Sequence, residues 1–218
     1  MRIGVLGSGD VGQVLASGFL KHGYEVMIGT RNQAKLAAWT ERTGGAGRVG
    51  SFGETAAFGD AIVLAVKGAV AQETLKMAGA ENLAGKTVMD ATNPIADAPP
   101  VNGVLHFFTS LDSSLMERLQ ASYPAAKFVK TFSCVGNALM VNPDFGGVKP
   151  TMFICGNDAQ AKQEVSRILD QFGHEVEDLG AAEAARAIEP LCILWCIPGF
   201  LRNDWMHAFK VLRKKEGS

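Results

Sequence analysis

The feature that most restricts the fold of this chain is a glycine-rich turn near its first residues. Residues 3–6 form a short apolar segment, and the hexapeptide GSGDVG at residues 7–12 follows it and opens a helical pattern over residues 10–22. A GxGxxG turn between a strand and a helix lets a pyrophosphate approach the backbone, and the free N–H groups of the helix start attract its negative charge. We therefore predict a dinucleotide site rather than a simple packing turn, with Asp10 as the helix N-cap. The expected contacts are Gly7, Ser8, Gly9, Asp10, Val11 and Gly12.

The rest of the chain alternates short apolar segments with segments of helical periodicity. Strands are predicted at residues 3–6, 25–28, 48–51, 61–66, 87–91, 128–132, 151–155 and 175–179. Helices are predicted at residues 10–22, 33–42, 70–77, 111–122 and 158–172, with Asn32 as the N-cap of the second. This alternation favours an α/β fold with a Rossmann-type doubly wound, mostly parallel sheet. Residues 97–106 are rich in proline and are expected to form an ordered loop.

The pattern changes after the last predicted strand. We interpret residues 1–180 as the dinucleotide-binding domain and residues 181–218 as a small helical lobe that closes the pocket. Pro198 and Gly199 are expected to interrupt the helix, and a second helical pattern is expected from Trp205 to Lys215. The lobe carries more apolar residues than so short a segment can bury alone, which predicts a homodimer.

Composition narrows the class of protein. The net charge of −1 gives no basic field for nucleic acid or for an anionic membrane surface. No uninterrupted apolar run reaches the roughly 18 residues of a membrane span. The cysteines form no Cys-x-x-Cys pair and have no histidine at metal-ligand spacing, so we expect structural thiols, with Cys192 and Cys196 on one buried helix stripe, and no metal site. These features predict a soluble, cytoplasmic protein.

The end of the second predicted strand distinguishes between the two nicotinamide dinucleotides. NAD sites usually place an acid there for the ribose hydroxyls, but the nearest acid, Glu25, lies at the start of the strand. Thr30, Arg31 and Lys35 supply a hydroxyl and two cations instead, and Arg31 and Lys35 are spaced to share one helix face. A guanidinium binds phosphate through two hydrogen bonds. The residues Thr30, Arg31, Asn32 and Lys35 therefore predict NADP(H) rather than a solvated surface pair.

The redox end of the cofactor is expected where other strands end, because ligands of open parallel sheets lie outside the carboxyl ends of the strands. The predicted cofactor contacts there are Ala65, Val66, Lys67, Thr92, Asn93 and Pro94. The predicted substrate pocket is formed by Ser133, Cys134, Asn137 and His207. His22 and His174, beside helix-ending glycines, are expected to be solvated caps. The sequence shows no recognisable arrangement of catalytic acids and bases, and we predict no catalytic residue.

Several segments together resemble the F420-dependent NADP oxidoreductase family. They are GVLGSGDVGQVLASGFLKHGYEVMIGTRN, DATNPI, KTFSCVGN and WMHAFKVL. The chain is also similar to the cytosolic reductase domain of the six-transmembrane metalloreductases. The resemblance implies hydride transfer between NADPH and coenzyme F420, a 2′-phosphate site at Thr30, Arg31 and Lys35, rings near residues 133–137, and a last helix with His207 that closes the pocket. Archaeal members carry histidine where Ser133 stands here and lack the loop at Pro99 and Pro100.

Three other functions remain open at this stage. The chain is compatible with an NADPH reductase that uses a free flavin, a quinone or a ferric chelate. It is also compatible with an NADP(H)-binding sensor that has no turnover. A hydroxyacid or imino-acid dehydrogenase with a long helical C-terminal domain ranks lower, because the residues after the last predicted strand are too few for such a domain.

Overall fold

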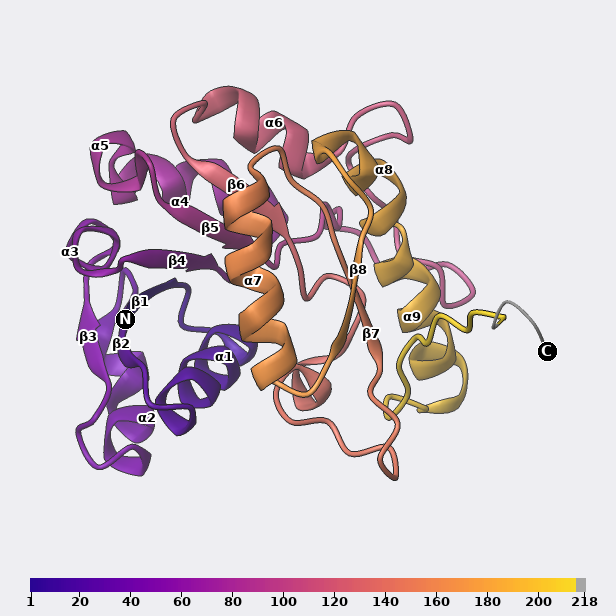
Figure 1. Ribbon diagram of the computed structural model, residues 1–218, viewed down its shortest axis with the longest axis horizontal. Coiled ribbons are helices and arrows are strands. Elements are labelled where there is room, and N and C mark those ends of the chain that lie inside the picture. Colours follow the sequence, from indigo (N-terminus) through magenta and orange to yellow (C-terminus); the bar gives the residue numbers. More distant parts are fainter. Residues whose placement is uncertain (215–218) are drawn as a thin grey trace.

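The computed structural model describes residues 1–214 and is built around a six-stranded parallel sheet (Figure 1). The strand order is β3-β2-β1-β4-β5-β6. The strands are β1 (Arg2–Leu6), β2 (Glu25–Gly29), β3 (Arg48–Gly50), β4 (Ala61–Leu64), β5 (Thr87–Asp90) and β6 (Lys127–Lys130). The order reverses direction between β1 and β4, which creates a crevice at the carboxyl ends of these two strands. The predicted doubly wound parallel sheet is confirmed.

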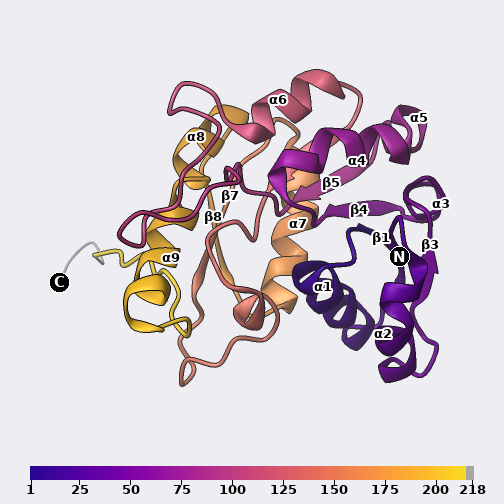
Figure 2. The same ribbon diagram turned by 180° about the vertical axis from the view of Figure 1, so that it is seen from behind.

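Side chains alternate across the sheet and build one apolar core on each face. In β4, Ile62 and Leu64 pack into one core and Val63 into the other. The first face is covered by α1 (Asp10–Lys21), α2 (Ala37–Arg42) and α7 (Ala159–Gln171). The second face is covered by α3 (Phe52–Phe58), α4 (Ala71–Ala78), α5 (Ala80–Leu83) and α6 (Leu115–Ser122), as the view from behind shows (Figure 2). Two-sided burial explains why β4, with the sequence AIVL, is apolar throughout.

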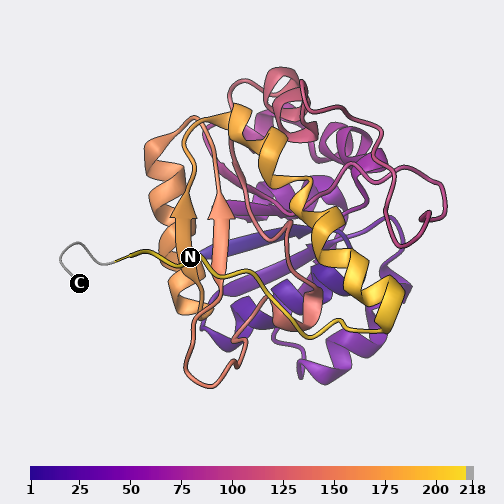
Figure 3. The same ribbon diagram turned by 90° about the vertical axis from the view of Figure 1, so that its right-hand side faces the viewer.

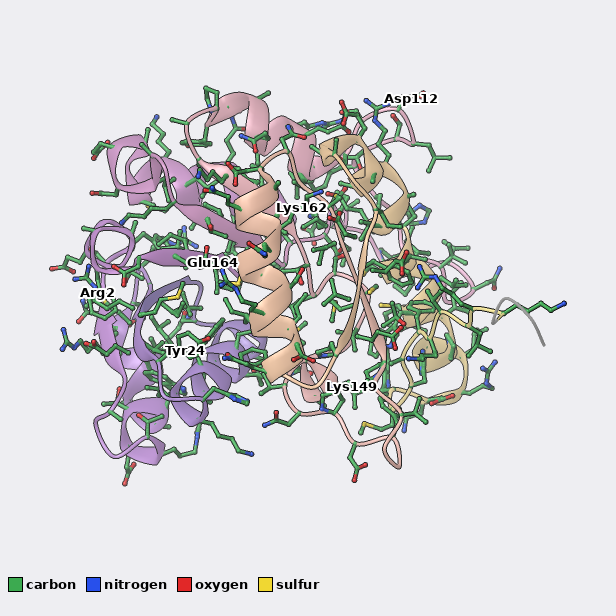
Figure 4. The ribbon with its side chains drawn as sticks, viewed as in Figure 1. Arg2, Tyr24, Asp112, Lys149, Lys162 and Glu164 are labelled. Carbon is green, nitrogen blue, oxygen red and sulfur yellow. The ribbon has the colours of Figure 1, made fainter. Side chains whose placement is uncertain are left out.

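The last two strands do not extend the main sheet. Strands β7 (Thr151–Ile154) and β8 (Glu175–Asp178) form a separate parallel pair, joined to the end of β6 by a single bridge between Lys130 and Cys155. Helix α7 connects the two sheets through charged side chains that project from opposite sides of the helix (Figure 4). Lys162 donates to Asp178 of β8 at 3.0 Å, and Glu164 accepts from Thr87 of β5 at 2.5 Å.

The C-terminal segment differs from its prediction in two ways. A short turn η4 (Ala182–Ala184) and α8 (Ala185–Ile188) lead into α9 (Leu191–Arg202), which continues through Pro198 and Gly199 instead of ending there. Gly199 has a packing role, because a Cβ at this position would lie 2.2 Å from the Trp205 indole. The helix predicted from Trp205 is absent among the described residues, and residue 215 lies outside them. Residues 203–214 instead run beside β7, where Thr151 N–H donates to the Phe209 carbonyl at 2.8 Å.

The stretch Ala182–Arg202 is long and apolar enough, by length and composition alone, to cross a membrane, and no other stretch in residues 1–214 passes that test. Sequence inspection missed it because polar residues interrupt the apolar run. One third of the stretch is buried, including Ala182, Ala185 and Ile188, which pack in the core beside α6. Figure 3 shows α9 crossing the end of the molecule toward which the strands of the main sheet point.

Several helix starts also differ from prediction by a turn. The helix predicted from residue 111 begins at Leu115, because Ser114 and Glu117 form a reciprocal capping box. The helix predicted from residue 33 begins as a 3₁₀ turn, η1 (Gln33–Leu36), before α2. Asn32 is its N-cap, as predicted, and accepts a hydrogen bond from the Ala34 N–H. A second short 3₁₀ turn, η2 (Gly68–Val70), precedes α4.

Candidate functional site

The glycine turn has the geometry that a bound pyrophosphate needs. Gly7 has φ of 133°, and a Cβ there would lie 2.1 Å from the Ala65 carbonyl oxygen. A Cβ on Gly12 would lie 2.0 Å from the Gly7 carbonyl oxygen, so both positions exclude side chains. Gly9 has open space where its Cβ would be. Gly9, not Asp10, is the N-cap of α1 and makes no side-chain hydrogen bond, so the prediction for Asp10 is wrong and the helix start stays open for an anion.

The turn after β2 is organised around a buried hydroxyl. The Thr30 hydroxyl lies 3.0 Å from Ser8 Oγ of the glycine turn, and it accepts from the Asn32 N–H at 3.1 Å. Thr30 is buried, whereas Arg31 and Lys35 are exposed, and the side chains of these two cations make no hydrogen bond or ion pair within residues 1–214. Arg31 precedes the N-cap Asn32, so Arg31 and Lys35 do not share a helix face as predicted.

This exposed turn carries no acid for ribose hydroxyls. Glu25 lies at the opposite end of β2, where its carboxylate is 3.7 Å from Arg48. The donor set of two free cations and two adjoining hydroxyls fits a 2′-phosphate better than a diol.

The loops after β4 and β5 are in close contact. The Ala65 N–H donates to the Leu6 carbonyl and so extends the pairing of β4 with β1. A Cβ on Gly7 would meet the Val66 side chain. A Cβ on Gly68 would lie 2.2 Å from the Asn93 carbonyl oxygen, so this close contact also requires glycine. Lys67 is exposed at the edge of the crevice.

A cavity of about 320 Å³, which we call the ring cavity, lies where these loops meet α9. Asn93 donates from Nδ2 to the Ser133 carbonyl oxygen at 3.1 Å. The remaining polar atoms of this pair, Asn93 Oδ1 and Ser133 Oγ, are buried and have no hydrogen-bond partner within residues 1–214. Buried polar atoms without partners are uncommon, and these two match the carboxamide of a nicotinamide. The ring cavity is lined by Asp10, Val11, Ala91, Asn93, Phe132, Ser133, Val135, Gly136, Asn137, Met140, Cys192, Trp195 and Cys196.

Trp195 of α9 forms one wall of the ring cavity, and His207 holds its indole in place. Its Nε1 donates to the His207 carbonyl at 2.8 Å, and the His207 ring stacks on the indole with centroids 5.1 Å apart. A Cβ on Gly136 would lie 2.4 Å from the indole, so the loop after β6 packs directly on this wall. His207 itself does not line the cavity. It supports Trp195 from an extended segment rather than from a final helix.

Four other residues differ from their predictions. Cys134, predicted in the substrate pocket, belongs to the apolar core, and burial raises the pKa of its thiol to about 11. His174, predicted to be solvated, is buried and its Nε2 bonds the Met140 carbonyl at 3.0 Å. Burial lowers the pKa of His174, so its imidazole is the neutral form. Cys192 and Cys196 line the ring cavity, although only a packing role was expected for them.

A buried charge network supports the loop that carries Asn93. The Lys130 ammonium is completely buried, 2.7 Å from Asp90 Oδ2 and 3.0 Å from Glu189 Oε1. It also donates to the Thr92 carbonyl at 2.9 Å, and Asp90 Oδ1 accepts from the Thr92 N–H and hydroxyl. Glu189 accepts from the first two N–H groups of α6. Burial alone would lower the pKa of Lys130, but the two carboxylates outweigh it and raise that pKa.

The network joins β5, β6, α6 and the end of α8, where Glu189 is the C-cap, and sequence inspection missed it. A lysine at the end of an apolar strand, KFVK at residues 127–130, was the available signal, because a central strand rarely ends in a cation without a partner. The neighbouring Phe132 was also missed. It is buried, lines the ring cavity and has φ of 57°, a left-handed conformation that costs about 1–2 kcal/mol for a non-glycine residue.

The chain is similar to known proteins in sequence and in structure. Residues 2–94 match the family model for coenzyme F420-dependent NADP oxidoreductases. A protein from Arthrobacter sp. FB24, provisionally designated an F420-dependent NADP-reductase, is 36% identical and superposes with a TM-score of 0.91 over 98% of this chain and all of that one. An imine reductase from Streptomyces aurantiacus, 16% identical with a TM-score of 0.68 over 92% of this chain and 63% of that one, shares the fold.

Two metalloreductases are also similar to this chain. STEAP3 from Rattus norvegicus is 29% identical over 92% of this chain and 39% of its own length. Human STEAP2 is 27% identical over 88% of this chain and 36% of its own length. The chain therefore spans well under half of these curated relatives. The family match and the full-length likeness to the Arthrobacter protein lead to one conclusion: this chain belongs to the F420-dependent NADP oxidoreductase family and is an NADP-dependent oxidoreductase.

Proposed function

We propose that the chain transfers hydride between NADPH and a deazaflavin, coenzyme F420. The observation that carries this proposal is the ring cavity, where the unpaired Asn93 Oδ1 and Ser133 Oγ lie beside the aromatic wall of Trp195. NADPH, when bound, supplies a hydride at its nicotinamide ring. Among the described lining residues Asp10 is the single carboxylate, and neither histidine nor lysine lines the cavity. Transfer between two stacked rings suits this lining, because it depends on proximity, orientation and exclusion of water.

Each part of the chain has a positioning task in this proposal. Asn93 Oδ1 accepts from the amide of a carboxamide, and Ser133 Oγ donates to its carbonyl oxygen. The turn with Gly9 holds the pyrophosphate, and Arg31 and Lys35 hold the 2′-phosphate. Helix α9 covers the rings and excludes water through Trp195.

A reductase that uses free flavin, quinone or ferric chelate is the second candidate, because the likeness to metalloreductases extends over nearly the whole of this chain. A sensor without turnover is the third. A two-substrate assay separates all three. NADPH oxidation is followed with coenzyme F420, FMN and a ferric chelate in turn, and the absorbance of the deazaflavin is recorded in the same cuvette.

We expect equimolar loss of NADPH and oxidised F420, and slower reaction with the other acceptors. Preference for FMN or ferric chelate would replace the proposal with the second candidate. Tight NADPH binding without turnover of any acceptor would favour the sensor.

The exposed surface of α9 supports the predicted homodimer. Leu194, Phe200 and Leu201 are large apolar residues with roughly half of their surface exposed, at 54%, 44% and 56%. The loop that contains the exposed Val101 and Val104 lies beside Leu201, since a Cβ on Gly103 would lie 3.1 Å from Leu201 Cγ. A contiguous apolar surface of this kind is typical of an interface. Light scattering at micromolar concentration should give a dimer mass, and L201E should give a monomer mass; a monomeric wild type would contradict the proposal.

A further inference from the structure

A second hollow, which we call the α1 groove, adjoins the ring cavity. It has a volume of about 440 Å³ and lies between α1, the end of α2 and the loop that contains η3 (Asn137–Leu139). Asp10 and Asn137 line both hollows, so the groove and the ring cavity meet at these two residues. The groove is further lined by Gln13, Ser17, Lys21 and Arg42.

The sequence builds this groove from one face of α1. Asp10, Gln13, Ser17 and Lys21 are three or four residues apart and therefore form a single row along the helix. The opposite wall is close because α1 has glycine at position 18, where a Cβ would lie 2.5 Å from a methyl group of Val141. The groove thus has a fixed direction, from the ring cavity toward the C-terminal end of α1.

Charge is ordered along this direction. Asp10 stands at the junction with the ring cavity. Arg42 comes next, because its guanidinium donates to Gln13 Oε1 at 3.1 Å, one turn along α1 from Asp10. Lys21 stands at the far end, about 16 Å from Asp10 along the helix axis at 1.5 Å per residue. A ligand that follows the groove meets one anion and then two separated cations.

We propose that the α1 groove binds the anionic side chain of the second substrate, an inference that rests on the proposed function. With the ring in the ring cavity, a hydroxylated linker passes Asp10 and Asn137, where carboxylate and amide groups accept and donate hydrogen bonds. A first anionic group pairs with Arg42 and a later carboxylate pairs with Lys21. A ribityl phosphate is too short to reach Lys21, so the groove favours a deazaflavin with a phosphodiester and a carboxylate tail over FMN.

The test compares two forms of one ring, coenzyme F420 and the same deazaflavin without its phosphate–glutamate tail. KM for each form is measured for wild type, R42A and K21A, with K76A as a matched control, because Lys76 is exposed on α4 outside both hollows. NADPH dissociation constants are measured for the same proteins.

We expect R42A to raise KM for F420 about tenfold, as for the loss of a charge-assisted hydrogen bond, and K21A to raise it about threefold, as for an exposed ion pair. KM for the tail-less ring, the NADPH dissociation constants and all values for K76A should stay unchanged. R42K should recover most of the loss.

Four outcomes would overturn the inference. Equal KM values for F420 in wild type and both variants would remove the groove from the site while leaving the proposed function intact. Equal losses for both ring forms, or weaker NADPH binding in R42A, would show that these cations act elsewhere than on the tail. Absence of turnover with either ring in wild type would reject the proposed function and this inference with it.

Discussion

The two ends of the proposed cofactor site are built on different physical principles. The adenosine end is formed by residues 7–12 and 30–35, which are close in sequence, and its cations Arg31 and Lys35 are exposed. The nicotinamide end collects Asn93, Ser133 and Trp195 from distant segments and rests on the buried Lys130 network. The first is a local motif with charge in solvent, and the second is a product of tertiary packing. Changes at the first should affect which nucleotide binds, and changes at the second should affect stability and rate.

The largest effect is expected from removing the buried cation with K130M. Asp90 and Glu189 would be left as buried carboxylates without a counter-ion, which costs about 3–5 kcal/mol in the free energy of unfolding. Denaturant titration measures this loss. K149M is the control, because Lys149 pairs with Asp170 at the surface and should change stability by less than about 1 kcal/mol. If K130M were as stable as wild type, the nicotinamide end would not depend on buried charge.

At the adenosine end, R31A should weaken NADPH binding by about 1–3 kcal/mol, because a phosphate loses a charged hydrogen-bond partner. NADH binding and the free energy of unfolding should stay the same, since Arg31 is exposed and has no partner among residues 1–214. Calorimetric titration with both nucleotides provides the measurement. Arg202, exposed at the end of α9, supplies the control R202A. Similar affinities of the wild type for NADH and NADPH would contradict the 2′-phosphate site.

The corresponding change at the nicotinamide end is N93A. It should lower kcat/KM by about 1–2 kcal/mol of transition-state stabilisation, through the loss of one hydrogen-bonding amide. The loss should be the same with NADPH and NADH as donor. Adenosine 2′,5′-bisphosphate, which lacks the nicotinamide, should bind N93A as it binds wild type but should bind R31A more weakly. If this fragment bound N93A more weakly than wild type, the two ends of the site would not act independently.

The smallest effect is expected from a surface ion pair that holds α8 against α6. Arg186, aided by Ser114, lowers the pKa of Glu117 from 4.5 to about 2. Because the folded state favours the ionised carboxylate, the pair stabilises the fold above about pH 4.5, and this contribution is lost as the pH falls toward 2. E117Q should therefore lose about 1 kcal/mol at neutral pH after solvent screening, and the difference from wild type should shrink in acid. If the difference in stability between E117Q and wild type did not change with pH, the loss would come from packing rather than from the charge of Glu117.

Much of the fold could be predicted because its signals are local. Most strand positions follow from apolar runs, although β3 (RVG) and β8 (EVED) are exceptions, and the glycine turn follows from spacing alone. The helix starts were less accurate where a capping box decided them: Ser114 with Glu117 would have placed α6 correctly. The path of α9 could not be predicted from Pro198 and Gly199, because Gly199 is required by the distant Trp205 ring rather than by its own helix.

The two ends of the proposed site also differ in how far the sequence predicts them. The adenosine end at Thr30, Arg31 and Lys35 stays a prediction, and the shared helix face expected for the two cations was wrong. The nicotinamide end was only partly recognisable, because the role of Cys192 or Lys130 depends on which strands and helices meet around it. Periodicity reports whether a residue is buried, but it does not report which residues surround it.

The position of α9 also affects the order in which the site is completed during synthesis. Translation proceeds from the N-terminus at about 5–20 residues per second, so the glycine turn and the turn after β2 leave the ribosome well before Trp195. A nascent chain therefore acquires its phosphate-binding half first and its aromatic wall last. An NADPH molecule bound at that stage would have its nicotinamide in contact with water, protected from stray acceptors only once α9 folds across it.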